Sequence, residues 1–105
     1  MSRGEIWMFR CAPPDKQRPV LVLTRSDMIG VFNTVTVAPL TRTIRGSASE
    51  VMVDEDSGLK EPSAINLHHV VTVPKVGLRR FVGTVSPDVL GQVRSALLFA
   101  VGFNG

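Results

Sequence analysis

The residues best suited to chemistry are an arginine and a threonine at the ends of two apolar runs. Arg18 precedes Pro19 and the run 20–24, and Thr41 follows the run 35–40. Because proline pushes the preceding residue out of the helical region, Arg18 is predicted to be extended and to enter a buried strand. A guanidinium cannot be buried in a core with the apolar residues that follow it, so Arg18 is expected at the exposed start of the strand, facing an anion. Two strands that deliver arginine and threonine to one edge indicate a phosphate-handling site.

The same two residues also allow a structural interpretation. Arg18 could pair with Asp15 or Asp27 at the surface, and a threonine at a strand end is often a turn residue. The sequence pattern by itself leaves both interpretations open.

Seven short apolar runs separated by turn signals are predicted to be strands. They cover residues 5–9, 19–24, 34–40, 50–53, 64–67, 70–73 and 80–85. The runs 64–67 and 70–73 flank His68 and His69 and could form one bent strand. Gly83, inside the last run, predicts a bulge or a close approach of two backbones.

A helix is predicted after the last strand. Ser86 suits the N-cap, Pro87 the first helical position and Gly102 the left-handed position after the helix. Phe103 could then pack back on Leu98. The residues at helical spacing on one face are Leu90, Val93, Leu97 and Val101. Many short strands with one terminal helix predict a mainly β fold of the α+β class, a small β-barrel or twisted sheet capped by the helix.

Size and composition predict one cytoplasmic domain that self-associates. The 105 residues suffice for a single core, and 44% of them are hydrophobic, which is more than so small a monomer can bury. The stretch 96–101 is apolar on every side, so a second copy of the chain is expected against it, forming a homodimer. The sole cysteine, Cys11, excludes an intramolecular disulfide. No segment resembles a signal peptide or a membrane span, so no membrane association is expected.

The charge of the chain is unevenly placed. Residues 50–61 carry five carboxylates against Lys60, a local net charge of −4, which leaves +7 for the rest of a chain whose net charge is +3. This balance favours a polyanionic partner.

Four segments, in order along nearly the whole chain, resemble the MazF/PemK toxins, which are endoribonucleases of bacterial toxin–antitoxin pairs. They are Arg-Gly-Glu-Ile-Trp at 3–7, Arg-Pro-Val-Leu-Val-Leu at 18–23, Val-Ala-Pro-Leu-Thr at 37–41 and Pro-Ser-Ala-Ile-Asn-Leu at 62–67. The resemblance implies a small SH3-like β-barrel with a C-terminal helix, MazF/CcdB-like, as one domain over residues 1–105 and built as a homodimer.

The resemblance also implies a reaction. Relatives of this kind cut single-stranded RNA at short recognition sequences without a metal ion or cofactor. The ribose 2′-OH attacks the neighbouring phosphate and leaves a 2′,3′-cyclic phosphate and a 5′-hydroxyl. Such chemistry requires proton transfer at two oxygens and positive charge on the phosphorane. The family's catalytic arginine matches Arg18, and its threonine matches Thr41.

The proton-transfer group departs from the family pattern. The loop before Arg18 lacks the glutamate of relatives, and Asp15 is only a nearby candidate. Where relatives often carry Asp or Glu and then Gln, this chain has His68 and His69. An imidazole titrates near neutral pH, so His68 is hypothesised to be the third catalytic residue. If the segment is extended, His69 is expected on the opposite face.

Side chains around these positions are expected to contact the RNA, because cations bind phosphates and amides bind base edges. The residues predicted for this role are Lys16, Gln17, Arg42, Arg45 and Asn66.

Three interpretations of function follow. The leading one is an RNA-cutting toxin, neutralised by a MazE-like antitoxin whose acidic tail suits the basic remainder of the chain. The substrate could be messenger, transfer or ribosomal RNA. The second is a non-enzymatic, CcdB-like inhibitor of DNA gyrase. The third is a catalytically weak paralogue that binds RNA or an antitoxin.

Overall fold

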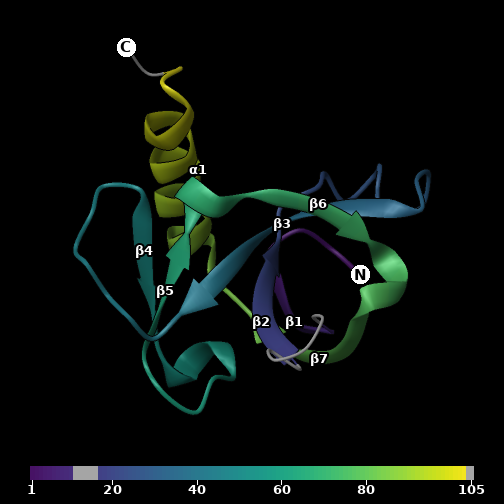
Figure 1. Ribbon diagram of the computed structural model, residues 1–105, viewed down its shortest axis with the longest axis horizontal. Helices are drawn as coiled ribbons and strands as arrows, with labels where there is room; N and C mark the ends of the chain where they lie inside the picture. The colour runs from purple at the N-terminus through teal and green to yellow at the C-terminus, as the bar shows by residue number, and fades with distance from the viewer. Residues whose placement is uncertain (11–16, 104–105) are drawn as a thin grey trace.

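The computed structural model describes residues 1–10 and 17–103, and these fold into a seven-stranded sheet with one α-helix (Figure 1). The strands are β1 (Glu5–Arg10), β2 (Gln17–Val22), β3 (Thr34–Thr41), β4 (Glu50–Val53), β5 (Ser63–Asn66), β6 (Val71–Pro74) and β7 (Leu78–Thr84), and the helix is α1 (Pro87–Val101). Three single 3₁₀ turns connect them: η1 (Glu55–Ser57), η2 (Leu67–His69) and η3 (Lys75–Gly77). Each predicted strand is confirmed, most of them with shifted ends, and so is the predicted helix.

The sheet is antiparallel and forks at β3. Its strand order is β4-β5-β3-β2-β1-β7, and β6 also pairs with β3. Along the edge of β3 opposite β2, the first half pairs with β6 (Val37↔Val71) and the last residues pair with β5 (Thr41↔Ala64). Turn η2 fills the gap between these two partners. The predicted α+β fold is confirmed; the sheet stays open, because β4 and β7 end its path without pairing to each other.

Two apolar cores occupy the two faces of the sheet. Side chains alternate along β2 and β3, so that Leu21 faces one core while Val20 and Val22 face the other. Helix α1 covers the first core with Val93 and Ala96, and it stands beside β4 in Figure 1. Burial of both faces explains why these strands read as continuous apolar runs.

The helix begins and ends at the predicted residues. The Ser86 Oγ accepts a hydrogen bond from the Val89 N–H (3.2 Å), and Gly102 is left-handed with φ 79°. However, the side chain of Val101 is 53% exposed, so it does not belong to the buried face as predicted. Phe103 bonds back to the Leu98 carbonyl through its backbone N–H (3.0 Å), but its side chain is 84% exposed. The last turn of α1 reaches beyond the sheet, where no core remains to bury them (Figure 1).

Gly83 marks a close approach of two backbones, as predicted. The pairing of β1 with β7 shifts register between Ile6 and Trp7, opposite this part of β7. A Cβ atom at Gly83 would collide with the carbonyl oxygen of Ser57 in η1. Glycine is therefore needed where β7 passes the η1 turn.

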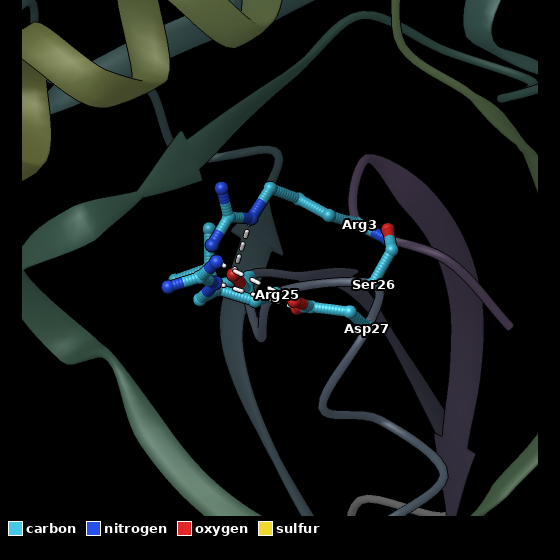
Figure 2. Close-up of polar contacts among 5 residues, drawn as sticks. Arg3, Arg25, Ser26 and Asp27 are labelled. Carbon is cyan, nitrogen blue, oxygen red and sulfur yellow. Dashed lines mark hydrogen bonds and ion pairs between the residues drawn. The ribbon is translucent and has the colours of Figure 1, made fainter.

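The N-terminal segment is tied to the connection after β2. The Arg3 Nε donates to the Leu23 carbonyl (2.8 Å), and the Arg3 backbone N–H donates to the Ser26 Oγ (3.0 Å), as Figure 2 shows. In the same connection Asp27 forms an ion pair with Arg25 (3.3 Å). Asp27, named as a surface partner for Arg18, is thus engaged by another arginine, and Asp15 lies outside the described residues.

Candidate active site

The ends of β2 and β3 carry the predicted arginine and threonine. The two strands pair from Val22↔Val37 to Val20↔Pro39, and extending this register by two residues sets Arg18 opposite Thr41. Pro19 and Pro39 have no N–H to donate, so the ladder weakens there and the strand ends can separate. Arg18 is exposed, whereas Thr41 is half-buried.

A hollow of about 540 Å³ opens beside these strand ends, and we call it the first hollow. It is lined by Arg18, Pro39, Leu40, Thr41, Thr43, Arg45, Ser47, Ser49, Glu50, Asn66, His68 and His69. Five side chains predicted from the sequence meet here: Arg18, Thr41, Arg45, Asn66 and His68. Residues more than forty positions apart in the sequence therefore share one cavity wall.

The hydroxyl of Thr41 is oriented by its neighbour. The Thr43 backbone N–H donates to the Thr41 Oγ1 at 3.1 Å. A hydroxyl has one donor hydrogen and two acceptor lone pairs, so accepting this bond leaves its hydrogen to donate elsewhere. Thr41 can therefore donate a hydrogen bond to an anion in the first hollow.

Both histidines lie in turn η2, and Asn66 holds the turn. The Asn66 Oδ1 accepts from the His68 backbone N–H (3.0 Å), which fixes the amide so that its Nδ2 lies 3.3 Å from the His69 Nδ1. The Nδ2 group can only donate, so the His69 Nδ1 is the acceptor in this contact.

The expectation that His69 lies on the opposite face applies only to an extended segment, and residues 67–69 are not extended. The segment is a 3₁₀ turn and not a strand, because it fills the fork between β5 and β6. The two rings are exposed, with centroids 6.3 Å apart, and both line the first hollow. The site thus holds two imidazoles where the sequence indicated one.

Glu50 is a site residue that the sequence did not indicate, because it stands in the acidic segment 50–61, which was considered only for its charge. Its Oε1 accepts hydrogen bonds from the backbone N–H groups of Arg45 and Ser47, both at 3.1 Å. Ser47 also bonds the buried Ser49 through their hydroxyls (2.6 Å). These bonds fix the loop that forms one wall of the first hollow. The sequence does carry a signal for this loop, namely the close spacing of Ser47, Ser49 and Glu50. Short polar side chains such as serine often form hydrogen bonds with nearby backbone groups.

Glu50→Ala is expected to loosen that loop, because two backbone N–H groups lose their acceptor. The expected loss of unfolding free energy is about 1–3 kcal/mol, with faster amide hydrogen exchange at Arg45 and Ser47. Glu50→Gln keeps an acceptor oxygen and is expected to stay near the wild type in both measurements. Equal hydrogen exchange in the two variants would show that Glu50 does not hold the loop.

The remaining predicted residues lie outside the first hollow. Arg42 forms an exposed ion pair with Glu61 (3.2 Å) and lines a second hollow on the other side of Arg18 and Thr41. Gln17 is exposed on β2 beside Arg10 and lines neither hollow. Lys16 lies outside the described residues.

Among residues 1–10 and 17–103, no three His, Cys, Asp or Glu side chains are grouped in a way that could hold a metal ion. No helix in these two ranges has the length and apolarity needed to cross a membrane.

The fold and the first hollow define a class: a small α+β protein in which a guanidinium, a hydroxyl donor and two imidazoles line one hollow beside the ends of two strands. Within that class, the chain belongs to the PemK-like, MazF-like toxins of type II toxin–antitoxin systems, whose family model matches residues 2–101. The resemblance inferred from the sequence is confirmed.

Individual relatives come from Mycobacterium tuberculosis. A protein called Endoribonuclease MazF3 is 42% identical over 88 residues, which cover 84% of this chain and 82% of that protein. A protein called Probable endoribonuclease MazF2 is 34% identical over 103 residues, covering 97% of this chain and 99% of that protein. The solved structure of the toxin MazF-mt6 matches with a TM-score of 0.87 at 36% identity, covering 93% of this chain and 96% of that one.

Proposed function

We propose that the chain is an endoribonuclease toxin that cuts single-stranded RNA at short recognition sequences. One observation carries the proposal: Arg18, Thr41 and His68 line a single hollow in a chain 42% identical to a protein called an endoribonuclease. The proposal treats residues 1–105 as one toxin domain, which the match of the family model over residues 2–101 supports.

In the proposed reaction the 2′-oxygen of one ribose forms a bond to the adjacent phosphorus, and the bond from phosphorus to the 5′-oxygen breaks. The products are a 2′,3′-cyclic phosphate and a 5′-hydroxyl, and no step requires a metal ion or a cofactor. Negative charge grows on the phosphoryl oxygens in the transition state, and Arg18 is assigned to neutralise it. Thr41 is assigned to donate a hydrogen bond to the same oxygens, in keeping with the hydrogen bond that its Oγ1 accepts from Thr43.

Proton transfer is assigned to the imidazoles. The 2′-OH must lose a proton as it attacks, and the 5′-oxygen must gain one as it leaves. His68 is the assigned catalytic residue for one of these transfers, since its exposed ring lines the same hollow as Arg18. His69, whose ring lines the same hollow, is suited to form a hydrogen bond with the RNA.

RNA binding is assigned to the walls of the site. Arg45 and Asn66 line the first hollow, and Arg42 lines the second. Lys16 and Gln17, just before Arg18 in the chain, complete the proposed set of contacts. Arginine contributes charge to bind phosphates, and amide side chains can read base edges.

The proposed partners are an antitoxin and a second copy of the chain. The family description names toxin–antitoxin systems, and the cationic hollows suit the acidic tail of a MazE-like antitoxin. The homodimer is supported by apolar side chains on the outer face and end of α1, where Phe99 is 52% exposed. The proposed location is the cytoplasm, where both the RNA and the antitoxin would be met.

The test is incubation of the purified protein with a mixed single-stranded RNA pool in EDTA, followed by mapping of the new ends. We expect discrete cuts with 5′-hydroxyl ends, and the mapped sequences identify the recognised bases and the class of RNA. Uncut RNA from a folded protein would overturn the proposal. A gyrase assay on the same sample then separates a CcdB-like inhibitor from an inactive paralogue.

A further inference from the structure

Arg18 and Thr41 stand between two hollows. The second hollow has a volume of about 460 Å³, and both residues line it as well as the first. Its wall consists of Met8, Arg18, Pro19, Leu40, Thr41, Arg42, Gly58, Leu59, Lys60, Glu61, Ser63, Arg80 and Val82. A chain that passed from one hollow to the other would therefore cross the Arg18–Thr41 pair.

The second hollow is cationic at its rim. Lys60 comes from the segment after η1, and Arg80 from β7, where it lies opposite Met8. Both side chains are exposed, and within the described chain neither has a hydrogen bond or an ion pair. Arg42 is partly neutralised by its ion pair with Glu61 at 3.2 Å. Lys60 and Arg80 are thus the cations available to an incoming anion.

The inner wall of the second hollow is apolar. Met8, Pro19 and Leu40 project from three neighbouring strands, and Leu59 and Val82 complete the surface. An apolar wall with cations at its rim matches the chemistry of a nucleotide, whose base stacks or packs while its phosphate meets the cations. The first hollow differs in that hydroxyls, imidazoles and Glu50 line it beside its two arginines, Arg18 and Arg45.

We propose that the second hollow is an RNA subsite, with Lys60 and Arg80 binding backbone phosphates on one side of the scissile phosphate. The first hollow then holds the nucleotides on the other side, and the scissile phosphate lies at Arg18 and Thr41. This inference rests on the proposed ribonuclease function and adds to it the path of the strand across the protein.

The binding test uses a fluorescein-labelled pool of 2′-O-methyl RNA about ten nucleotides long, in which no 2′-OH is present to attack. The double variant Lys60→Ala/Arg80→Ala is expected to lose two phosphate contacts. The slope of log K against log salt concentration should then fall by about 1.4, with about tenfold weaker binding at low salt. The matched control is Arg79→Ala/Arg94→Ala, which removes two exposed arginines that line neither hollow. An equal change of slope in both double variants would overturn the inference.

The cleavage test uses RNAs shortened on either side of a mapped cut. On full-length RNA the Lys60/Arg80 variant is expected to show about tenfold higher KM with little change in kcat. The KM of the variant should become equal to that of the wild type on RNA that lacks the nucleotides on the side of the cut bound by the second hollow. A variant that matches the wild type on every RNA overturns the subsite alone. A wild type that does not cut overturns the proposed function, and the 2′-O-methyl pool still decides the subsite.

An acidic peptide is the competing occupant, and a poly-glutamate peptide serves as its probe. If the Lys60/Arg80 variant loses affinity for the peptide but not for the RNA pool, the second hollow is a protein-docking surface and the inference is overturned. Loss of RNA affinity in the variant, with a slope change absent from the control, supports the subsite.

Discussion

Arg18→Ala is expected to lower kcat for RNA cleavage by about 10²–10³-fold while the melting temperature stays close to that of the wild type. Removing one preorganised group that stabilises transition-state charge typically has an effect of this size. Arg18 is exposed at the end of β2, and the apolar residues of that strand begin only at Val20, so the core does not depend on it. Initial rates at saturating RNA and a thermal melt measure the two effects.

Arg25→Ala is the matched control for this prediction. It removes another exposed arginine, one that pairs with Asp27 (3.3 Å) and lines neither hollow, so its rate should equal that of the wild type. Arg18→Lys keeps the charge but loses the planar fork of donors, so an intermediate rate is expected. An unfolded Arg18→Ala would make Arg18 a structural residue, and a fully active one would remove it from the catalytic site.

Local sequence was enough to predict the strands and the helix. The proline before an apolar run predicted the position of β2. Both ends of α1 were predicted from Ser86, Pro87 and Gly102. These signals act within a few residues, because proline restricts its neighbour and capping groups bond to the nearest turn. For the same reason Arg18 and Thr41 could be assigned to strand ends from the sequence alone.

The fork at β3 could not be predicted in this way. Turn η2 exists because β3 pairs with β6 along its first half and with β5 at its end, which is a long-range arrangement. Only this arrangement turns His69 toward the first hollow beside His68. The expected opposite face of His69 depended on an extended segment, and local sequence does not show that residues 67–69 form a turn.

The second hollow was missed for a related reason. Lys60 follows the acidic turn η1 in sequence, and Arg80 lies in β7, so no local pattern connects either with Arg18. They meet because the η1 segment packs against β7, where Gly83 lets the two backbones approach. The position of one glycine thus bears on the geometry of the proposed RNA path.

Gly83→Ala is expected to destabilise the protein by about 3 kcal/mol, because its Cβ atom would collide with the Ser57 carbonyl oxygen. Backbone on both sides must move to admit the methyl group, and a domain of this size would then lose about 10–20 °C in melting temperature. The displaced η1 segment carries Leu59 and Lys60 with it, so RNA binding at the second hollow should weaken as well. A thermal melt and the salt dependence of binding measure both effects.

Gly91→Ala is the control that separates this clash from the general cost of replacing glycine. Gly91 lies within α1, and a Cβ atom there meets nothing within 4 Å. Alanine at that position should raise the unfolding free energy by about 0.5–1 kcal/mol, since it restricts the unfolded chain and favours the helix. If Gly83→Ala melts at the wild-type temperature while Gly91→Ala is stabilised, the contact between β7 and η1 is looser than the structure indicates. The second hollow would then not depend on Gly83 for its shape.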